Sequence, residues 1–343
     1  MDLSGKTILV TGGAGFLGRY IIAALRERGA GVRAFQRSAA DDLAAAGVEV
    51  VRGSVTDAAA LRRAAQGCAA VIHTAAKAGV WGPRREYTEA NIGGTRNVLA
   101  ACREAGVPWL VHTSTPSVVF SGEPFEGADE SLPYGKNWLC HYAETKAAAE
   151  QEALAADGSG DLRVCALRPH LIWGLGDPHL LPRVIARARA GRLAVVGDGD
   201  NRVDITHVRN AAEAHLLALD ALAEGRAGGK AYFLSQGEPV GLWPWIQDLL
   251  GRLNIPPVKR RLSFAAAYRV GAVAETVWRV LRLGGEPPMT RFVATELAKS
   301  HWFDISASRR DLGYHPERHP TEAGLREYAL AHAVGGKPGT PSD

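Results

Sequence analysis

Short apolar runs alternate with segments of helical apolar spacing through the first half of the chain. Apolar runs of this length predict buried strands, and the longer periodic segments between them predict helices. Alternating strands and helices form a parallel sheet with right-handed crossovers. We therefore expect an α/β fold with a doubly wound parallel sheet, whose first strands lie at 6–11, 31–36, 48–52, 69–74, 108–115 and 162–168.

The pattern changes after residue 171, where loops rich in glycine and proline, several tryptophans and irregular spacing replace the alternation. A helical segment and one more apolar run then return to the main sheet. We therefore predict a larger domain, 1–171 with 204–235, and a smaller, discontinuous C-terminal substrate lobe, 172–203 with 236–334. The last residues, 335–343, have the composition of a disordered tail.

A glycine-rich loop separates the first strand from the first helix. Gly12, Gly13, Gly15 and Gly18 satisfy both G-x-x-G-x-x-G and G-x-G-x-x-G. Glycines at these places allow a tight turn, bring a pyrophosphate close to the bare backbone, and let the helix pack on the strand. Because strand, loop and helix follow in the required order, the sequence predicts a Rossmann domain that binds a dinucleotide.

The end of the second strand predicts which dinucleotide binds. Domains that prefer NAD place an acid there to accept hydrogen bonds from the ribose hydroxyls. This chain has Gln36 at that place, followed by Arg37. A guanidinium binds a 2′-phosphate through charge-assisted hydrogen bonds, whereas a carboxylate repels it. We therefore predict NADPH as the cofactor, with Arg37 as the residue that discriminates.

Tyr142 and Lys146 lie four residues apart in a helical segment and therefore share one face of the helix. An ammonium beside a phenol favours the phenolate, so we expect Lys146 to lower the pKa of Tyr142. The pair predicts a proton donor for a carbonyl that is reduced by hydride. Thr115, the last hydroxyl of the HTSTP segment, lies at the carboxyl end of a parallel strand, and Pro116 favours an extended Thr115. Ser114 is the alternative if the register is shifted by one residue.

The glycine loop, the TST at a strand end and the Y-x-x-x-K segment together resemble the extended short-chain dehydrogenase/reductases over nearly the whole chain. The resemblance implies that Tyr142 is the acid and base, that Lys146 holds the ribose, and that Thr115 polarises the substrate carbonyl. It also implies an Asn91 beside the site, a strand-end loop over the cofactor from His73 to Ala76, and Ser54 where relatives commonly have an adenine-binding Asp. The implied cofactor contacts are Gly12, Gly15, Phe16, Leu17, Gly18, Arg37, Ala75 and Lys146.

The expected substrate is a lipid-like ketone, because the loops that should surround it offer Trp81, Leu171 and Trp173 rather than charges. The same aromatic residues could equally form core. The segments AAKAGVWG, RPHLIWGLGDPHLLPR and GEPPMTRF resemble the 3β-hydroxysteroid dehydrogenase branch, and most of all the bacterial 2-alkyl-3-oxoalkanoate reductases of olefin synthesis. That resemblance implies NADPH-dependent reduction of a 2-alkyl-3-keto acid. Candidate partners for its carboxylate are Arg84, Arg85, His170 and His179, and His170 could instead be structural.

Three other functions remain open. A 3β-hydroxysteroid dehydrogenase working in the oxidative direction is disfavoured by Arg37, and a nucleotide-sugar epimerase or dehydratase would want polar residues in the second lobe. A non-catalytic NADP sensor or scaffold on this fold would not need Tyr142, Lys146 and Thr115.

Composition narrows the function further. The 343 residues are 46% hydrophobic and 22% charged, with a net charge of +4 and no Lys/Arg tract, so a nucleic-acid partner is not expected. Four scattered cysteines favour neither a metal site nor disulfides. We expect a cytoplasmic protein with no spanning segment, in which helix 264–283 packs on the second lobe, lies at a membrane surface or lines the substrate entry. Resemblance implies a homodimer through 84–105 and 138–156, and allows an assembly with other olefin-pathway enzymes.

Overall fold

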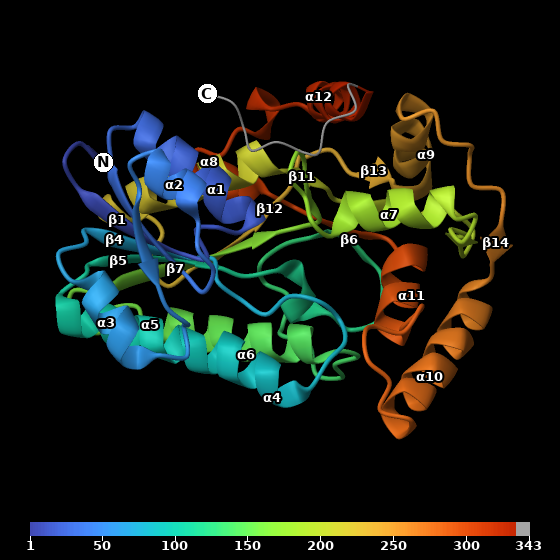
Figure 1. The fold of residues 1–343 in the computed structure, drawn as a ribbon, viewed down its shortest axis with the longest axis horizontal. Helices are drawn as coiled ribbons and strands as arrows, with labels where there is room; N and C mark the ends of the chain where they lie inside the picture. Colours follow the sequence, from blue (N-terminus) through green and yellow to red (C-terminus); the bar gives the residue numbers. More distant parts are fainter. Residues whose placement is uncertain (334–343) are drawn as a thin grey trace.

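A seven-stranded parallel sheet forms the centre of the structure, a computed structural model that describes residues 1–333 (Figure 1). Every pairing in this sheet is parallel, and the strand order is β12-β7-β5-β4-β1-β2-β3. The doubly wound α/β fold is therefore confirmed. The strands are β1 (Thr7–Thr11), β2 (Gly31–Gln36), β3 (Glu49–Arg52), β4 (Ala70–His73), β5 (Trp109–Thr113), β7 (Arg163–Pro169) and β12 (Ala231–Leu234).

Helices cover both faces of this sheet, which is why its strands are apolar on both sides. Along β1, Ile8 and Val10 pack on one face and Leu9 packs on the other. The first face is covered by α1 (Phe16–Glu27), α2 (Asp41–Ala45) and α8 (Val208–Ala223) (Figure 1). The second is covered by α3 (Ala58–Ala65), α5 (Gly94–Ala105) and α6 (His141–Ala155).

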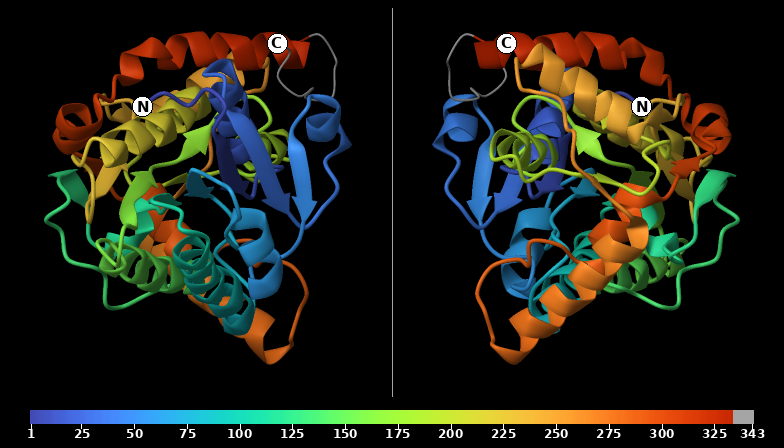
Figure 2. Two further views of the ribbon diagram at one scale, coloured as in Figure 1. Left: turned by 90° about the vertical axis from the view of Figure 1, so that its left-hand side faces the viewer. Right: turned by 90° about the vertical axis from the view of Figure 1, so that its right-hand side faces the viewer.

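A second region joins short strands and the remaining helices (Figures 1 and 2). Its largest sheet has the order β13-β10-β15-β6, from Val240–Gly241, Arg202–Val203, His301–Phe303 and Phe125–Ala128. Two further pairs join β8 (Ile172–Trp173) to β11 (Thr206–His207) and β9 (Val195–Val196) to β14 (Arg261–Leu262). Its helices are α7 (Leu180–Arg189), α9 (Leu242–Arg252), α10 (Phe264–Val280), α11 (Arg291–Ala298) and α12 (Thr321–Ala333).

The remaining helical segments are short. They are α4 (Arg84–Tyr87), two π-helical turns at Thr88–Gly93 and Ser308–Leu312, and two 3₁₀ turns at Pro116–Val119 and Pro316–Arg318. The π-helical turn at Thr88–Gly93 joins α4 directly to α5, so these three elements form one continuous rod beside α6.

The second region has its own apolar core, in which Trp173, Trp243 and Trp245 are all buried. The chain crosses between the two regions. β6 comes from within 1–171 but pairs with β15, while Phe303 and Tyr314 pack in the core of the main sheet. Short crossing segments of this kind carry no periodic signal, so the predicted division did not include them. The tail predicted at 335–343 lies outside the described residues.

The glycine loop is packed more tightly than any side chain would allow. Gly12 has a φ of +73°, which favours glycine. A Cβ at Gly12 would lie 3.0 Å from the backbone nitrogen of Ala75, and a Cβ at Gly18 would lie 2.3 Å from the carbonyl oxygen of Gly12. The loop therefore brings the start of α1 directly against the end of β1.

We expect Gly18→Ala to lower the free energy of unfolding by about 1–3 kcal/mol, because the added methyl must push α1 away from the loop. Urea denaturation of the protein without cofactor measures this. Gly251→Ala is the matched control, since its Cβ would meet no atom within 4 Å. There a helical alanine should raise the free energy of unfolding by roughly 0.5–1 kcal/mol. Equal stability of Gly18→Ala and the unaltered protein would contradict this account of the loop.

Candidate active site

Tyr142 and Lys146 lie in the first two turns of α6, at the carboxyl end of the main sheet. The helix begins at His141 with Cys140 as its N-cap, so the phenol projects from the first turn. Tyr142 packs against an apolar cluster that includes Phe120, Cys140 and Phe292. Lys146 is one turn further along and only 4% exposed. Lys146 is therefore buried, whereas Tyr142 is partly buried against the apolar cluster.

Thr115 lies beside Tyr142. Its backbone is extended, with φ −161° and ψ 149°, as Pro116 predicts. Its hydroxyl accepts a hydrogen bond from the backbone N–H of Ser117 at 3.3 Å and is close enough to the Tyr142 phenol to hydrogen-bond it. The Ser114 hydroxyl, by contrast, is buried without a partner in residues 1–333. The geometry therefore favours Thr115 over Ser114 as the hydroxyl that works with Tyr142.

The expected lowering of the Tyr142 pKa is wrong for the protein without cofactor. Burial raises the pKa of Tyr142 to about 12, and the Thr115 hydroxyl only partly opposes this effect. The Lys146 ammonium instead points to β5, where it donates to the carbonyl oxygen of Thr113 at 2.6 Å. Tyr142 is therefore a neutral phenol at pH 7, which is the form that can donate a proton.

Burial lowers the pKa of Lys146 to about 8, and the carboxylate of Glu150 one turn later partly opposes this shift. Glu150 is itself fully buried and forms an ion pair with Arg168 on β7 at 2.5 Å. The Tyr134 hydroxyl donates to the same carboxylate at 2.8 Å. This buried network joins α6 to β7 directly behind the candidate catalytic residues.

Two neutral histidines surround the Lys146 ammonium. His112 Nε2 lies 3.4 Å from its Nζ, and burial lowers the pKa of His112 well below its usual value. Burial and the charge of Lys146 lower the pKa of His73 to about 3. His73 is held by the Thr11 hydroxyl at 2.7 Å and the Thr95 hydroxyl at 3.3 Å. Both imidazoles are therefore structural, and neither competes with Lys146 for a proton.

Asn91 positions the loop that follows β4. Its side chain accepts from the Lys77 N–H at 2.7 Å and donates to the Lys77 carbonyl oxygen at 3.2 Å. It also donates to the Thr145 hydroxyl on α6 at 3.0 Å. Further along the loop, the Tyr87 hydroxyl donates to the carbonyl oxygens of Gly79 and Trp81. The loop is thus tied to α6 and held near the place predicted for the cofactor.

The predicted cofactor contacts gather around the glycine loop. Phe16 and Leu17 form the first turn of α1, which contains no acidic residue that would repel a phosphate. Ala75 packs against Gly12, and its N–H reaches the Thr11 hydroxyl at 3.3 Å. Ser54 instead bonds to Thr56 within its own turn.

Gln36 and Arg37 differ in their surroundings at the end of β2. The Gln36 side chain is 7% exposed, and its amide makes no hydrogen bond within the described residues. A Cβ at Gly13 would lie 3.2 Å from its Oε1, so the amide faces the glycine loop. Arg37 is exposed and forms no hydrogen bond or ion pair with residues 1–333. A buried amide without a partner is costly, and both side chains are thus available to a ligand in the loop.

The residues predicted to contact substrate do not all meet at Tyr142. Trp81 is half-buried on the loop after β4. Trp173 is fully buried in the second core, edge-on to Trp245 at 5.6 Å, because its neighbours enclose it completely. Its expected place in the substrate pocket is therefore not supported. Arg84 and Arg85 are exposed and paired with Glu144 and Glu89, and His179 is exposed before α7.

His170 belongs to a buried chain of hydrogen bonds between the two regions. Its Nε2 lies 2.6 Å from Nδ1 of His301, and Nε2 of His301 reaches the Glu296 backbone oxygen at 2.8 Å. Burial raises the pKa of Glu296 and lowers that of His170. Two nitrogen ligands of one zinc ion, each about 2.0–2.1 Å from the metal, would lie further apart than the 2.6 Å that separates these two histidine nitrogens. The pair as it stands therefore shares a proton, and a metal would require it to open.

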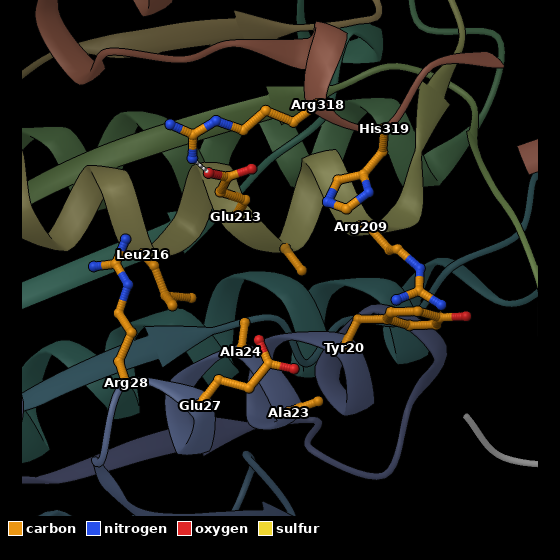
Figure 3. A pocket seen from close by; sticks show the side chains of 11 residues that line it. Tyr20, Ala23, Ala24, Glu27, Arg28, Arg209, Glu213, Leu216, Arg318 and His319 are labelled. Carbon is orange, nitrogen blue, oxygen red and sulfur yellow. Dashed lines mark hydrogen bonds and ion pairs between the residues drawn. The ribbon is translucent and has the colours of Figure 1, made fainter. Parts of the chain in front are cut away.

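A hollow of ≈ 450 Å³ lies elsewhere, between α1 and α8 (Figure 3). Its charged side chains largely pair with acids: Arg318 with Glu213, Arg209 with Glu327 and Arg28 with Asp220. Neither Tyr142 nor Lys146 lines it. This hollow is therefore separate from the candidate active site.

Sequence reasoning missed the contribution of α11 to the site. Phe292 packs on Phe120 with ring centroids 4.9 Å apart, and Val293 packs against the same cluster as Tyr142. These residues lie about 150 positions beyond Tyr142 in the chain, and no spacing rule connects them. The segment GEPPMTRF, which carries part of the family resemblance, ends at Phe292 and was the available signal.

The profile of the 3-beta hydroxysteroid dehydrogenase/isomerase family matches residues 9–264. The chain belongs to this family. Membership confirms the predicted resemblance and the prediction of an oxidoreductase that acts on CH–OH and ketone groups.

Two relatives and one solved structure give this membership more detail. A 2-alkyl-3-oxoalkanoate reductase from Stenotrophomonas maltophilia is 50% identical over 331 residues, which cover 95% of this chain and 99% of that protein. A 3 beta-hydroxysteroid dehydrogenase/Delta 5→4-isomerase from Mycobacterium tuberculosis is 36% identical, with 90% and 86% covered. The crystal structure of UDP-glucose 4-epimerase from Brucella ovis in complex with NAD has a TM-score of 0.73 and 25% identity, with 96% and 98% covered.

These similarities support a nicotinamide dinucleotide as the cofactor of this family member, as the glycine loop predicts. They also agree with the sheet topology, since the epimerase matches nearly the whole chain. Within residues 1–333, no helix is both long and apolar enough to cross a membrane.

We expect the affinity for the dinucleotide to fall as the pH rises through about 8. The pKa of Lys146 is about 8, so its ammonium is present below that pH and is lost above it. Titration of bound-cofactor fluorescence against pH measures this effect. In Lys146→Gln the affinity should be lower and should show no step near pH 8. A step that persists in Lys146→Gln would contradict the assignment.

Proposed function

We propose that the protein reduces a 2-alkyl-3-oxoalkanoate to the 2-alkyl-3-hydroxyalkanoate with NADPH. The observation that carries the choice of substrate is the 50% identity, over nearly the full length of both chains, to a reductase of that name. The chemistry is supported by the neutral Tyr142 phenol beside the Thr115 hydroxyl in an apolar cluster. A lipid-like ketone fits such surroundings better than a sugar nucleotide does.

The residues present fit the cofactor. The glycine loop has no room for side chains at Gly12 and Gly18, so its backbone stays tightly folded at the start of α1, whose first turn offers N–H groups to a pyrophosphate. The Gln36 amide, buried without a partner in the described chain, would bond a ribose hydroxyl, and the exposed Arg37 would bind a 2′-phosphate. Lys146 would donate to the hydroxyls of the nicotinamide ribose.

The reaction needs a proton donor and a stabilised oxyanion. When bound, NADPH supplies the hydride that adds to the ketone carbon. Tyr142 donates its phenolic proton to the carbonyl oxygen, and the Thr115 hydroxyl donates a hydrogen bond to the same oxygen. The low-dielectric cluster around Tyr142 strengthens both interactions. The Lys146 ammonium donates to the Thr113 carbonyl oxygen and so holds α6, which carries Tyr142, against β5.

A homodimer remains a further proposal. The segments 84–105 and 138–156 correspond to the α4–α5 rod and to α6, which lie side by side and are joined by the Arg96–Glu152 ion pair at 2.6 Å. Assembly with other enzymes of olefin synthesis and a cytoplasmic location are proposed on the resemblance alone.

The purified enzyme should consume NADPH with 2-alkyl-3-keto acids much faster than with 3-ketosteroids or nucleotide sugars, as followed by the loss of NADPH absorbance. Tyr142→Phe should lower kcat by about a hundredfold or more, because the proton donor is removed while the ring still packs. Thr115→Val should also lower kcat, since it removes the hydroxyl and keeps the shape.

Ser114→Ala serves as the control for Thr115→Val, because the Ser114 hydroxyl has no partner in residues 1–333 and should tolerate removal. Faster turnover of steroids would support the 3β-hydroxysteroid dehydrogenase alternative. No turnover of any ketone would support the sensor, and full activity in Tyr142→Phe would exclude the mechanism.

Arg37→Ala should weaken NADPH binding by roughly tenfold or more while leaving NADH binding unchanged, because only NADPH carries the phosphate that a guanidinium binds. Fluorescence titration of each dinucleotide measures both affinities without turnover. Arg63→Ala, at an exposed arginine on α3, controls for the loss of one surface charge. An equal loss for both dinucleotides in Arg37→Ala would refute the role of this residue as the discriminator.

A further inference from the structure

Exposed apolar side chains are concentrated on one helix. Among residues 1–333, seven large apolar side chains are exposed, and six of them belong to α10 and the turn after it. Val273 is 64% exposed and Val280 is 71% exposed. Contiguous apolar surface of this kind marks an interaction site rather than ordinary scatter. The six residues are Val270, Val273, Val277, Val280, Leu281 and Leu283, which we call the α10 apolar stripe.

The side of α10 that flanks the stripe is fastened to the protein. Ala267, Gly271 and Ala274 are buried, and a Cβ at Gly271 would lie 2.7 Å from the carbonyl carbon of Thr290. Glu275 accepts from the backbone N–H of Arg291 at 2.7 Å, at the start of α11. The helix therefore cannot roll to bury its stripe without breaking these contacts, and it extends from the body of the molecule opposite α12 (Figure 2).

The segment that carries the stripe is strongly basic. Residues 259–283 contain six cations, all exposed, and none forms an ion pair with a carboxylate of residues 1–333. The one acid in this segment, Glu275, is buried and already paired with Arg291. The six cations are Lys259, Arg260, Arg261, Arg269, Arg279 and Arg282. Such a combination of apolar stripe and uncompensated positive charge is complementary to an anionic lipid surface.

We propose that α10 docks the protein on an anionic lipid surface, with the apolar stripe inserted among the headgroups and the cations facing them. A second copy of this chain is a poorer occupant, because a two-fold contact through the stripe would bring the same unpaired cations against one another. With 17 residues and a flanking side held by α11, α10 lies along the surface rather than across it.

The docked helix lies next to the candidate active site. α11 packs on α10 and carries Phe292 and Val293 into the apolar cluster around Tyr142. The Arg279 guanidinium lies over the ring of Trp81, 5.8 Å from its centroid, on the loop after β4. A role of docking in the delivery of a lipid-like ketone rests on the proposed function, whereas the docking itself does not depend on it.

Co-sedimentation of the purified full-length protein with vesicles tests the docking without any turnover. We expect at least about tenfold stronger binding to vesicles of phosphatidylglycerol and phosphatidylcholine than to phosphatidylcholine alone, and weaker binding at high salt. The triple variant Val273→Ser, Val280→Ser, Leu281→Ser should lose about tenfold or more of this binding, because the inserted apolar surface is removed. Leu330→Ser, at a 61% exposed leucine on α12, is the matched control and should bind like the unaltered protein.

A second variant, Arg269→Gln with Arg282→Gln, should weaken binding to the anionic vesicles and reduce its salt dependence. Unchanged circular dichroism and thermal unfolding would show that each variant is folded. Binding equal in the triple variant and in Leu330→Ser, or no preference for anionic vesicles, would overturn the proposal. If light scattering without vesicles shows a dimer that the triple variant loses, the stripe binds a second copy of this chain and not a lipid surface.

Turnover of a short, water-soluble 2-alkyl-3-keto acid separates this proposal from the proposed function. The triple variant should retain that turnover and lose it only for a long-chain substrate presented in vesicles. If neither protein turns over the soluble ketone but the vesicle binding behaves as expected, the docking stands and the proposed function fails.

Discussion

The candidate active site depends on one buried interaction, the hydrogen bond from the Lys146 ammonium to the Thr113 carbonyl oxygen. This bond fixes α6 against the carboxyl end of β5. Tyr142, one turn before Lys146, is thereby placed beside Thr115, two residues after Thr113. The same ammonium, buried among neutral histidines, has a pKa lowered to about 8. The position of the candidate catalytic groups thus comes from one contact between helix and strand, and the lowered pKa of Lys146 comes from its burial.

Burial also explains why the pKa of Tyr142 is not lowered by Lys146 as the sequence predicts. Loss of solvation penalises both the phenolate and the ammonium, so the pKa of Tyr142 rises while that of Lys146 falls. The Glu150–Arg168 pair stands behind Lys146 and keeps part of the local charge balanced. A neutral phenol in an apolar pocket is well suited to give a proton to a ketone oxygen and poorly suited to remove one.

The periodic part of the fold was predictable, because β1, β2 and α1 each carry their own apolar pattern. The glycine loop between β1 and α1 was predictable as well, because its close packing leaves no room for side chains. The residue types of the candidate site were predictable for the same reason, since Tyr142, Lys146 and Thr115 follow local spacing rules. Trp173 was misplaced because aromatic residues line pockets and cores alike, and only its neighbours decide which. The roles of Phe292 and of the His170–His301 contact depend on pairs of residues more than 130 positions apart, which no local pattern encodes.

The pairing of β6 with β15 has a consequence for how this chain is made on the ribosome. β6 at residues 125–128 has no neighbour until residues 301–303 emerge, and β7 keeps an open edge until β12 is synthesised. An open edge of a parallel sheet exposes unpaired backbone groups that can recruit other chains. The nascent protein therefore carries an open β7 edge until β12 emerges and an unpaired β6 until β15 emerges, and both close only when its final third leaves the exit tunnel.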